Sequence, residues 1–161
     1  MKQDSALKKS LLINKIMEQM KKATGKHGAK KIAAAAIKQD STNADVYSAL
    51  GFFMFEKKYF SDAIAAFDKA LEIEPYLIQI LTYRAVARIH KNEPERKWVK
   101  TANSETSILT PFDKNNVPLA EREKICSDLK RADALRTIYG NSFDFLLVEN
   151  AAKYCDMDLR R

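Results

Sequence analysis

The sequence predicts an all-α protein, an α-solenoid of about three helical hairpins closed by C-terminal capping helices. Gly and Pro are scarce, with four of each in 161 residues, while helix-favouring residues such as Ala, Leu, Lys and Glu are plentiful. Apolar residues recur at intervals of three and four along much of the chain, as they do on one face of a helix. The pattern also repeats with a period of 34 residues between 10–43 and 44–77, which is typical of stacked hairpins.

The clearest repeat unit covers residues 44–77. Its spaced apolar positions are Tyr47, Leu50 and Met54 in the first half and Ala63, Phe67 and Ala70 in the second. Each half therefore predicts one helix. Gly51 and Ala63 have little or no side chain, so the two helices can approach closely where they cross. Residues 57–59 provide the short turn between them, and Pro75 ends the second helix.

This unit resembles the tetratricopeptide repeat at every characteristic position of that family. Only Met54 departs in type, because the family usually has Tyr there. The resemblance implies antiparallel hairpins whose first helices line a concave groove, in which a peptide segment of another protein binds. The expected protein is thus a peptide-binding module rather than an enzyme.

The flanking units are degenerate. Residues 10–43 fit the same register after a helix start at 1–9, and a third unit over 80–113 begins with Tyr83 on its first helix. Its second helix is expected to run through Val99 and Thr106. Helical spacing in 114–161 predicts the C-terminal cap. The apolar positions that set this spacing in its first helix are Leu119, Ile125, Leu129, Leu135 and Ile138. The whole chain, 1–161, is expected to form one domain.

The resemblance also implies which side chains face the groove. Phe52 and Phe55 would supply apolar contacts, and Arg84 and Arg88, one helical turn apart, would select acidic groups. The full set of expected groove residues is Asn14, Lys15, Ser48, Phe52, Phe55, Arg84 and Arg88. For the two phenylalanines an alternative stays open, since the N-terminal or a C-terminal helix could cover them instead.

Charge is distributed unevenly along the chain. The formal net charge is +7, and residues 1–40 alone hold ten Lys against three acids. A solvated helix face explains such a segment, and an acidic protein partner is the next interpretation. A basic adaptor that binds nucleic acid or an anionic membrane surface is an alternative function. The absence of aromatic residues before Tyr47 disfavours it, because bases cannot stack there.

The sequence contains no constellation typical of catalysis. His27 and His90 lack a nucleophile or an orienting acid nearby, so we expect no catalytic residues, no metal and no cofactor. Cys126 and Cys155 have no metal-binding spacing and are expected as buried thiols of a cytoplasmic protein. No apolar run is long enough to span a membrane.

A second use of such a module follows from its size. The chain resembles, in architecture alone, the small three-repeat chaperones of bacterial type III secretion, which keep export substrates soluble in the cytoplasm. The basic charge of this chain differs from that family's usual acidic character. Association of two copies through the ends of the stack also stays open.

Overall fold

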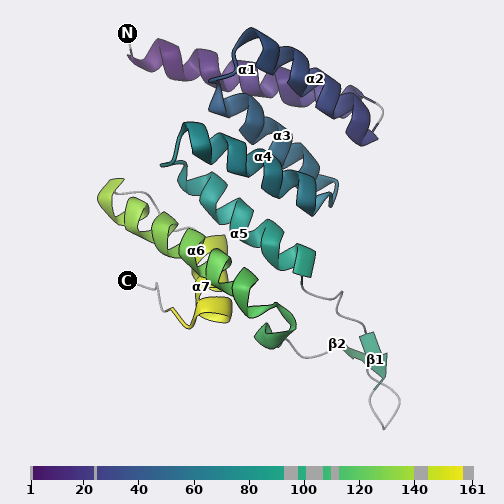
Figure 1. Cartoon of the computed structure of the whole chain (residues 1–161), viewed down its shortest axis with the longest axis vertical. Coiled ribbons are helices and arrows are strands. Elements are labelled where there is room, and N and C mark those ends of the chain that lie inside the picture. The colour runs from purple at the N-terminus through teal and green to yellow at the C-terminus, as the bar shows by residue number, and fades with distance from the viewer. Residues whose placement is uncertain are drawn as a thin grey trace.

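The computed structural model describes residues 2–23, 25–92, 98–100, 107–109, 113–139 and 145–157. In this part of the chain it forms α-helices and one short strand pair (Figure 1). The elements are α1 (Lys2–Lys22), α2 (Gly25–Gln39), α3 (Ala44–Glu56), α4 (Phe60–Ile73), α5 (Ile78–Asn92), β1 (Trp98–Lys100), β2 (Ser107–Leu109), η1 (Lys114–Asn116), α6 (Leu119–Tyr139) and α7 (Phe145–Cys155). The prediction of a helical protein is confirmed.

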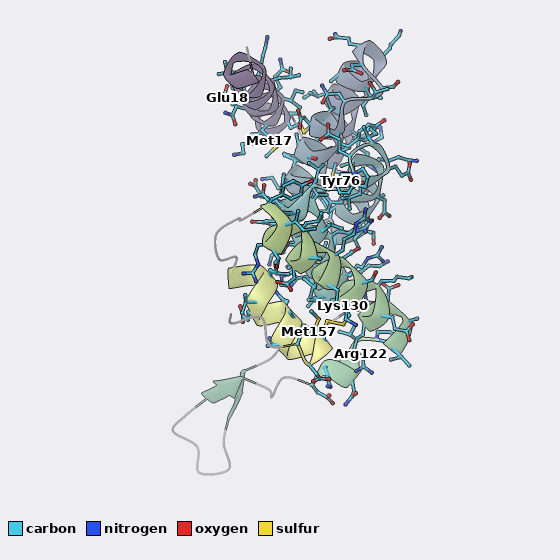
Figure 2. All side chains as sticks on the ribbon, turned by 90° about the vertical axis from the view of Figure 1, so that its left-hand side faces the viewer. Met17, Glu18, Tyr76, Arg122, Lys130 and Met157 are labelled. Carbon is cyan, nitrogen blue, oxygen red and sulfur yellow. A yellow bond between two sulfur atoms is a disulfide. The ribbon has the colours of Figure 1, made fainter. Side chains whose placement is uncertain are left out.

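The helices form an elongated row in which each packs on its neighbours in sequence. Figure 1 shows α1 and α2 at one end of the row, and α6 and α7 at the other. Helix α3 contacts both α1 and α2 and packs most extensively on α4, which in turn packs on α5. In the view of Figure 2, Met17 and Glu18 mark α1 and Met157 marks the segment after α7. The core is a continuous apolar layer between these helices.

The α3–α4 hairpin forms where the sequence predicts it. Asn43 caps α3, because its side-chain oxygen accepts a hydrogen bond of 3.0 Å from the Asp45 amide. The turn falls at residues 57–59, with Lys58 in the left-handed region at a φ of 61°. A Cβ added at Gly51 would lie 2.4 Å from Cε1 of Phe67, whose ring is fully buried. The expected close approach of the two helices is therefore present, and it depends on Gly51.

The expected second helix of the third unit is absent where it was placed. Trp98–Lys100 instead forms strand β1, which pairs antiparallel with β2 so that Val99 lies opposite Ile108. Val, Ile and Trp favour strands, a signal that the helical interpretation of this segment overlooked. Thr106, the other expected position of that helix, lies outside the described residues.

Helix α6 occupies the place beside α5 that the missing helix would have taken. It packs on α5 nearly as extensively as α4 does on α3, and it also contacts α7. Its buried apolar side, with Ile125, Leu129 and Leu135, confirms the helical spacing predicted there. Leu119 and Ile138 are instead 64 % and 73 % exposed, so the apolar stripe is shorter than expected. Helix α6 thus pairs with α5, and α7 lies at the end.

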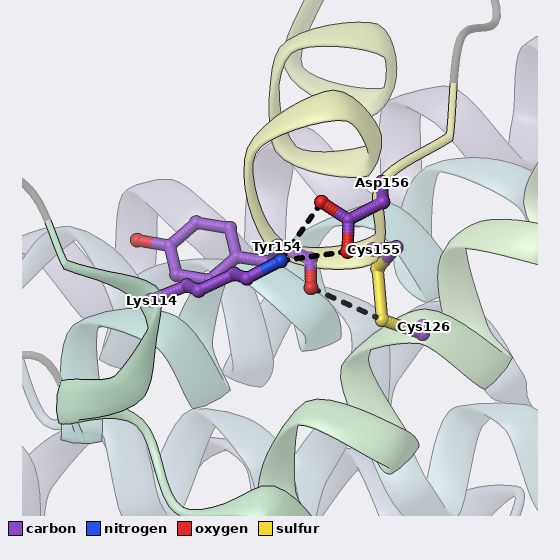
Figure 3. The surroundings of a disulfide bond; sticks show 5 residues. All are labelled: Lys114, Cys126, Tyr154, Cys155 and Asp156. Atoms are coloured by element: carbon purple, nitrogen blue, oxygen red, sulfur yellow. Dashed lines mark hydrogen bonds and ion pairs between the residues drawn. A yellow bond between two sulfur atoms is a disulfide. The ribbon is translucent and has the colours of Figure 1, made fainter.

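A disulfide between Cys126 of α6 and Cys155 of α7 joins the last two helices (Figure 3). The two Cα atoms lie 5.5 Å apart although 29 positions separate the residues in sequence. Beside it, Lys114 Nζ donates to both carboxylate oxygens of Asp156, at 2.8 and 2.6 Å. Cys126 Sγ also lies 3.7 Å from the Tyr154 carbonyl oxygen, but a disulfide sulfur has no proton to donate.

The expectation of two free thiols is therefore wrong. Sequence spacing could not reveal the pair, because packing of α6 on α7 brings the two sulfurs together. Disulfides persist mainly in oxidising compartments. The cysteines consequently lend no support to the expected cytoplasmic location.

We predict that Gly51→Ala destabilises the protein. Alanine is favoured over glycine inside a helix by about 1 kcal/mol, but its methyl group would collide with the buried Phe67 ring. Overpacking of this kind costs about 1–3 kcal/mol, so we expect a net loss in the free energy of unfolding measured in urea. The same substitution should cost less in a Phe67→Leu background, which removes the ring. Equal costs in both backgrounds would contradict the proposed contact.

We also predict that replacing both cysteines by serine lowers the free energy of unfolding by about 2–4 kcal/mol, because the unfolded chain loses a cross-link. Urea denaturation of the oxidised wild type and of the Cys126→Ser, Cys155→Ser variant measures the difference. Dithiothreitol should destabilise the wild type and leave the variant unchanged. Complete alkylation of both cysteines in the unfolded, unreduced chain would show that the bond does not form.

Candidate binding site

The predicted groove residues Phe52 and Phe55 belong to an aromatic cluster between α3, α4 and α5. The Phe52 ring meets the rings of Phe67 and Tyr83 edge to face, with centroids 5.4 and 4.9 Å apart. The Phe55 ring meets those of Phe60 and Tyr83 in the same way, at 5.7 and 5.3 Å. Both phenylalanines are half-buried. Rings on α4 and α5 therefore cover part of both phenylalanines, which is the kind of covering that the alternative expected from other helices.

Arg84 lies between helices and is bound to acids on both sides. Its Nε and Nη2 atoms donate to the two carboxylate oxygens of Asp128 on α6, at 2.9 and 2.5 Å. Its Nη1 donates to Asp68 on α4 at 2.6 Å. Burial alone would lower the pKa of Arg84, but these hydrogen bonds outweigh it and raise the pKa. The guanidinium therefore joins three helices as a permanently charged group.

Arg88 makes a second link of the same kind. Its Nη1 lies 3.1 Å from Oε2 of Glu121 on α6, and its Nη2 lies 3.8 Å from Asp68. A hydrogen bond from Lys124 lowers the pKa of Glu121, and Arg88 adds to this effect against the opposing influence of burial. Both expected acid-selecting arginines thus have acidic partners inside the protein. Sequence reasoning missed Asp128. This residue lies among the buried apolar residues of α6, and a carboxylate at such a position could have indicated an internal ion pair.

The remaining expected residues lie at separate places. Asn14 and Lys15 are exposed on α1, away from the aromatic cluster. Ser48 is buried on α3, and its hydroxyl donates a 2.9 Å hydrogen bond to the Ala44 carbonyl oxygen, so only its lone pairs remain available. Ser48 and Phe52 line one common pocket, whereas Lys15 lines a different one.

The pocket at Ser48 and Phe52 has a volume of about 680 Å³. Three parts of the fold form it, namely one side of α3 from Asp45 to Phe52, the link into α5 with the start of that helix, and the last residue of α6. Its wall includes Tyr76 and Tyr139, which are 63 % and 62 % exposed. Figure 2 shows Tyr76 in the middle of the row of helices, near the end of α6. Sequence reasoning missed both tyrosines, because neither belongs to a repeat position.

One polar atom at this pocket lacks a partner. Oδ2 of Asp45 is buried and has no hydrogen bond to any residue in the described ranges. Asp45 stands in the first turn of α3, where the positive end of the helix dipole stabilises a carboxylate. No Lys or Arg lines the pocket, so its chemistry combines aromatic and aliphatic surface with one carboxylate and several neutral polar groups.

Comparison with known proteins identifies no relative. No protein-family model, no curated protein and no solved structure matches this chain. The tetratricopeptide resemblance therefore stays a prediction from the residues. Within the described ranges, no helix combines the length and apolar character that crossing a membrane requires. Those ranges also contain no cluster of three or more His, Cys, Asp and Glu suited to a metal ion.

We predict that Arg84→Met lowers the free energy of unfolding by about 3–5 kcal/mol, because it leaves the buried Asp128 carboxylate without its cation. Urea denaturation measures the loss. The double variant Arg84→Met, Asp128→Leu should lose less than the single variant, since no unpaired charge remains. A single variant as stable as Lys91→Met, a matched change at an exposed position of α5, would contradict the structural role.

Proposed function

We propose that this protein is a tetratricopeptide-like interaction module that binds a peptide segment of a partner protein in the pocket between α3, α5 and α6. The proposal rests first on the order of helices. Helix pairs α1–α2, α3–α4 and α5–α6 follow one another along the row, and α7 follows them. The contact between Gly51 and Phe67 supplies the close crossing that the family's pattern implies.

The observation that carries the function is the pair of exposed tyrosines at the pocket. Tyr76 lies in the link before α5 and Tyr139 ends α6, and both leave most of their surface uncovered, although their rings could bury a large apolar area. Tyrosine is enriched among residues that dominate binding energy at interfaces, because it combines a large apolar ring with a hydroxyl. A partner side chain entering this pocket would cover both rings.

The wall of the pocket restricts the peptide that fits. Phe52 and Ile80 provide apolar surface, so the anchor of the peptide is expected to be aliphatic or aromatic. Asp45 is the charged group at the pocket, which favours a cationic or neutral neighbour of the anchor over an acidic one. Selection of acidic peptides by Arg84 and Arg88 is no part of the proposal, because both arginines are engaged by internal acids.

Selection of peptides from a random phage-displayed library tests the proposal. Substituting Tyr76→Ser and Tyr139→Ser together should lower the affinity for the selected peptides at least about tenfold, because two interface anchors are lost. Fluorescence anisotropy measures this affinity. These positions are better targets than Phe52 or Phe55, whose truncation would also disturb the packing on Tyr83.

Tyr59→Ser is the matched control, since Tyr59 is also exposed, at 42 %, but does not line the pocket. Its peptide affinity should equal that of the wild type. Circular dichroism of all variants should show unchanged helix content. The site is refuted if no peptide is enriched, or if the double variant and the control bind the selected peptides equally well.

A further inference from the structure

A second groove lies between α1 and α2, at the N-terminal end of the row of helices. It has a volume of about 590 Å³, and its wall comes from α1, α2 and Ala23 between them. Leu12 and Ile16 form its apolar side on α1, and Ile32 and Ala36 form it on α2. Leu12 is 41 % exposed and the preceding Leu11 is 59 % exposed. The groove is thus an apolar channel that the described part of the chain leaves open.

The position of this groove in the row explains why it is open. Helices α3, α4, α5 and α6 each pack on helices before and after them, whereas, among the described helices, the α1–α2 pair packs extensively on α3 alone (Figure 1). A terminal helical pair keeps an apolar face unless another element packs on it. A helix lying along α1 and α2 would continue the row by the same type of packing.

The charged side chains that line the groove are lysines. Lys15 and Lys22 line it and make no ion pair with any residue of the described ranges, and no acid lines it. The lysines of α2 that face α4 differ, because Lys26 and Lys30 both bind Asp62, at 2.6 and 2.5 Å. These two hydrogen bonds lower the pKa of Asp62 despite the opposing effect of burial. The positive charge of α2 is therefore partly neutralised within the fold, whereas that of the groove is not.

We infer that this groove binds an amphipathic acidic helix of a partner protein. The apolar stripe of that helix would lie between α1 and α2, and its carboxylates would pair with Lys15 and Lys22. These lysines are two helical turns apart, about 10 Å along α1. Acidic residues seven positions apart on a helix running along α1 would meet both of them.

The shape of the groove favours a protein helix over a lipid surface or nucleic acid. A bilayer binds apolar side chains that project outward, whereas most of the apolar groups here lie within a channel. The channel also has no aromatic residue on which a base could stack. A partner helix satisfies both features, because its side chains can enter the channel while its acids stay at the rim.

A synthetic helix of about 18 residues serves as the probe, with Leu at helical spacing and Glu beside the stripe. Its affinity for the full chain is measured by isothermal titration calorimetry at physiological salt. Reversing both charges with Lys15→Glu and Lys22→Glu should weaken binding at least about tenfold, and Leu12→Asp should do the same through the apolar contact. Lys21→Glu with Lys31→Glu is the matched control, since these exposed lysines change the net charge equally but do not line the groove. The control should bind the probe like the wild type.

Four results would overturn the inference. The first is equal binding of a probe with Lys in place of Glu, and the second is an equal loss of affinity in the control variant. The third is binding to phosphatidylglycerol vesicles or random duplex DNA that is stronger than binding to the probe and is abolished by Lys15→Glu with Lys22→Glu. The lysines would then recognise a lipid surface or a nucleic acid instead of a protein helix. The fourth is a dimer, seen by sedimentation, that Leu12→Asp dissociates. The Tyr76→Ser, Tyr139→Ser variant should keep full affinity for the probe, so failure here and failure of the proposed function are distinguishable.

Discussion

The close crossing of α3 and α4 is the contact on which the rest of the fold depends. Gly51 allows the buried ring of Phe67 to lie against the backbone of α3, and Phe67 in turn supports Phe52. Phe52 then packs on Tyr83, so the same contact positions α5. Because interiors are densely packed, a displaced ring at this point would shift each helix that follows. The pocket beside Phe52 therefore depends on a glycine that does not line it.

Ion pairs also fix the position of α6 on α5, although a long connection separates these two helices in sequence. A long connection costs conformational entropy, and the chain between these helices includes the β1–β2 hairpin. The bidentate bond of Arg84 to Asp128 and the bond of Arg88 to Glu121 give α6 a defined register on α5. Apolar packing alone tolerates sliding more readily than a directional charge pair does. The disulfide similarly sets the register of α7 on α6.

The two open surfaces differ in the charges that line them. The pocket between α3, α5 and α6 has Asp45 and two exposed tyrosines at its wall, and no Lys or Arg lines it. At the α1–α2 groove, cations line an apolar channel with no acid among them. On these two proposals, one molecule would hold two segments of opposite charge at the same time, since the surfaces share no residue. Such a protein would join two partners rather than capture one.

The sequence by itself determined that most of the chain is helical, and it located the α3–α4 hairpin and its turn, since apolar periodicity and the small residue Gly51 act over a few turns of chain. The family resemblance, rather than spacing, suggested Phe52 and Ser48 as groove residues, and both line the pocket between α3, α5 and α6. Only tertiary structure decided the partner of α5, the internal pairing of Arg84 with Asp128, the disulfide and the placement of Tyr76 and Tyr139 at one pocket. Each of these joins residues far apart in sequence. Local propensity carries no information about such contacts, because they exist only once whole helices have packed.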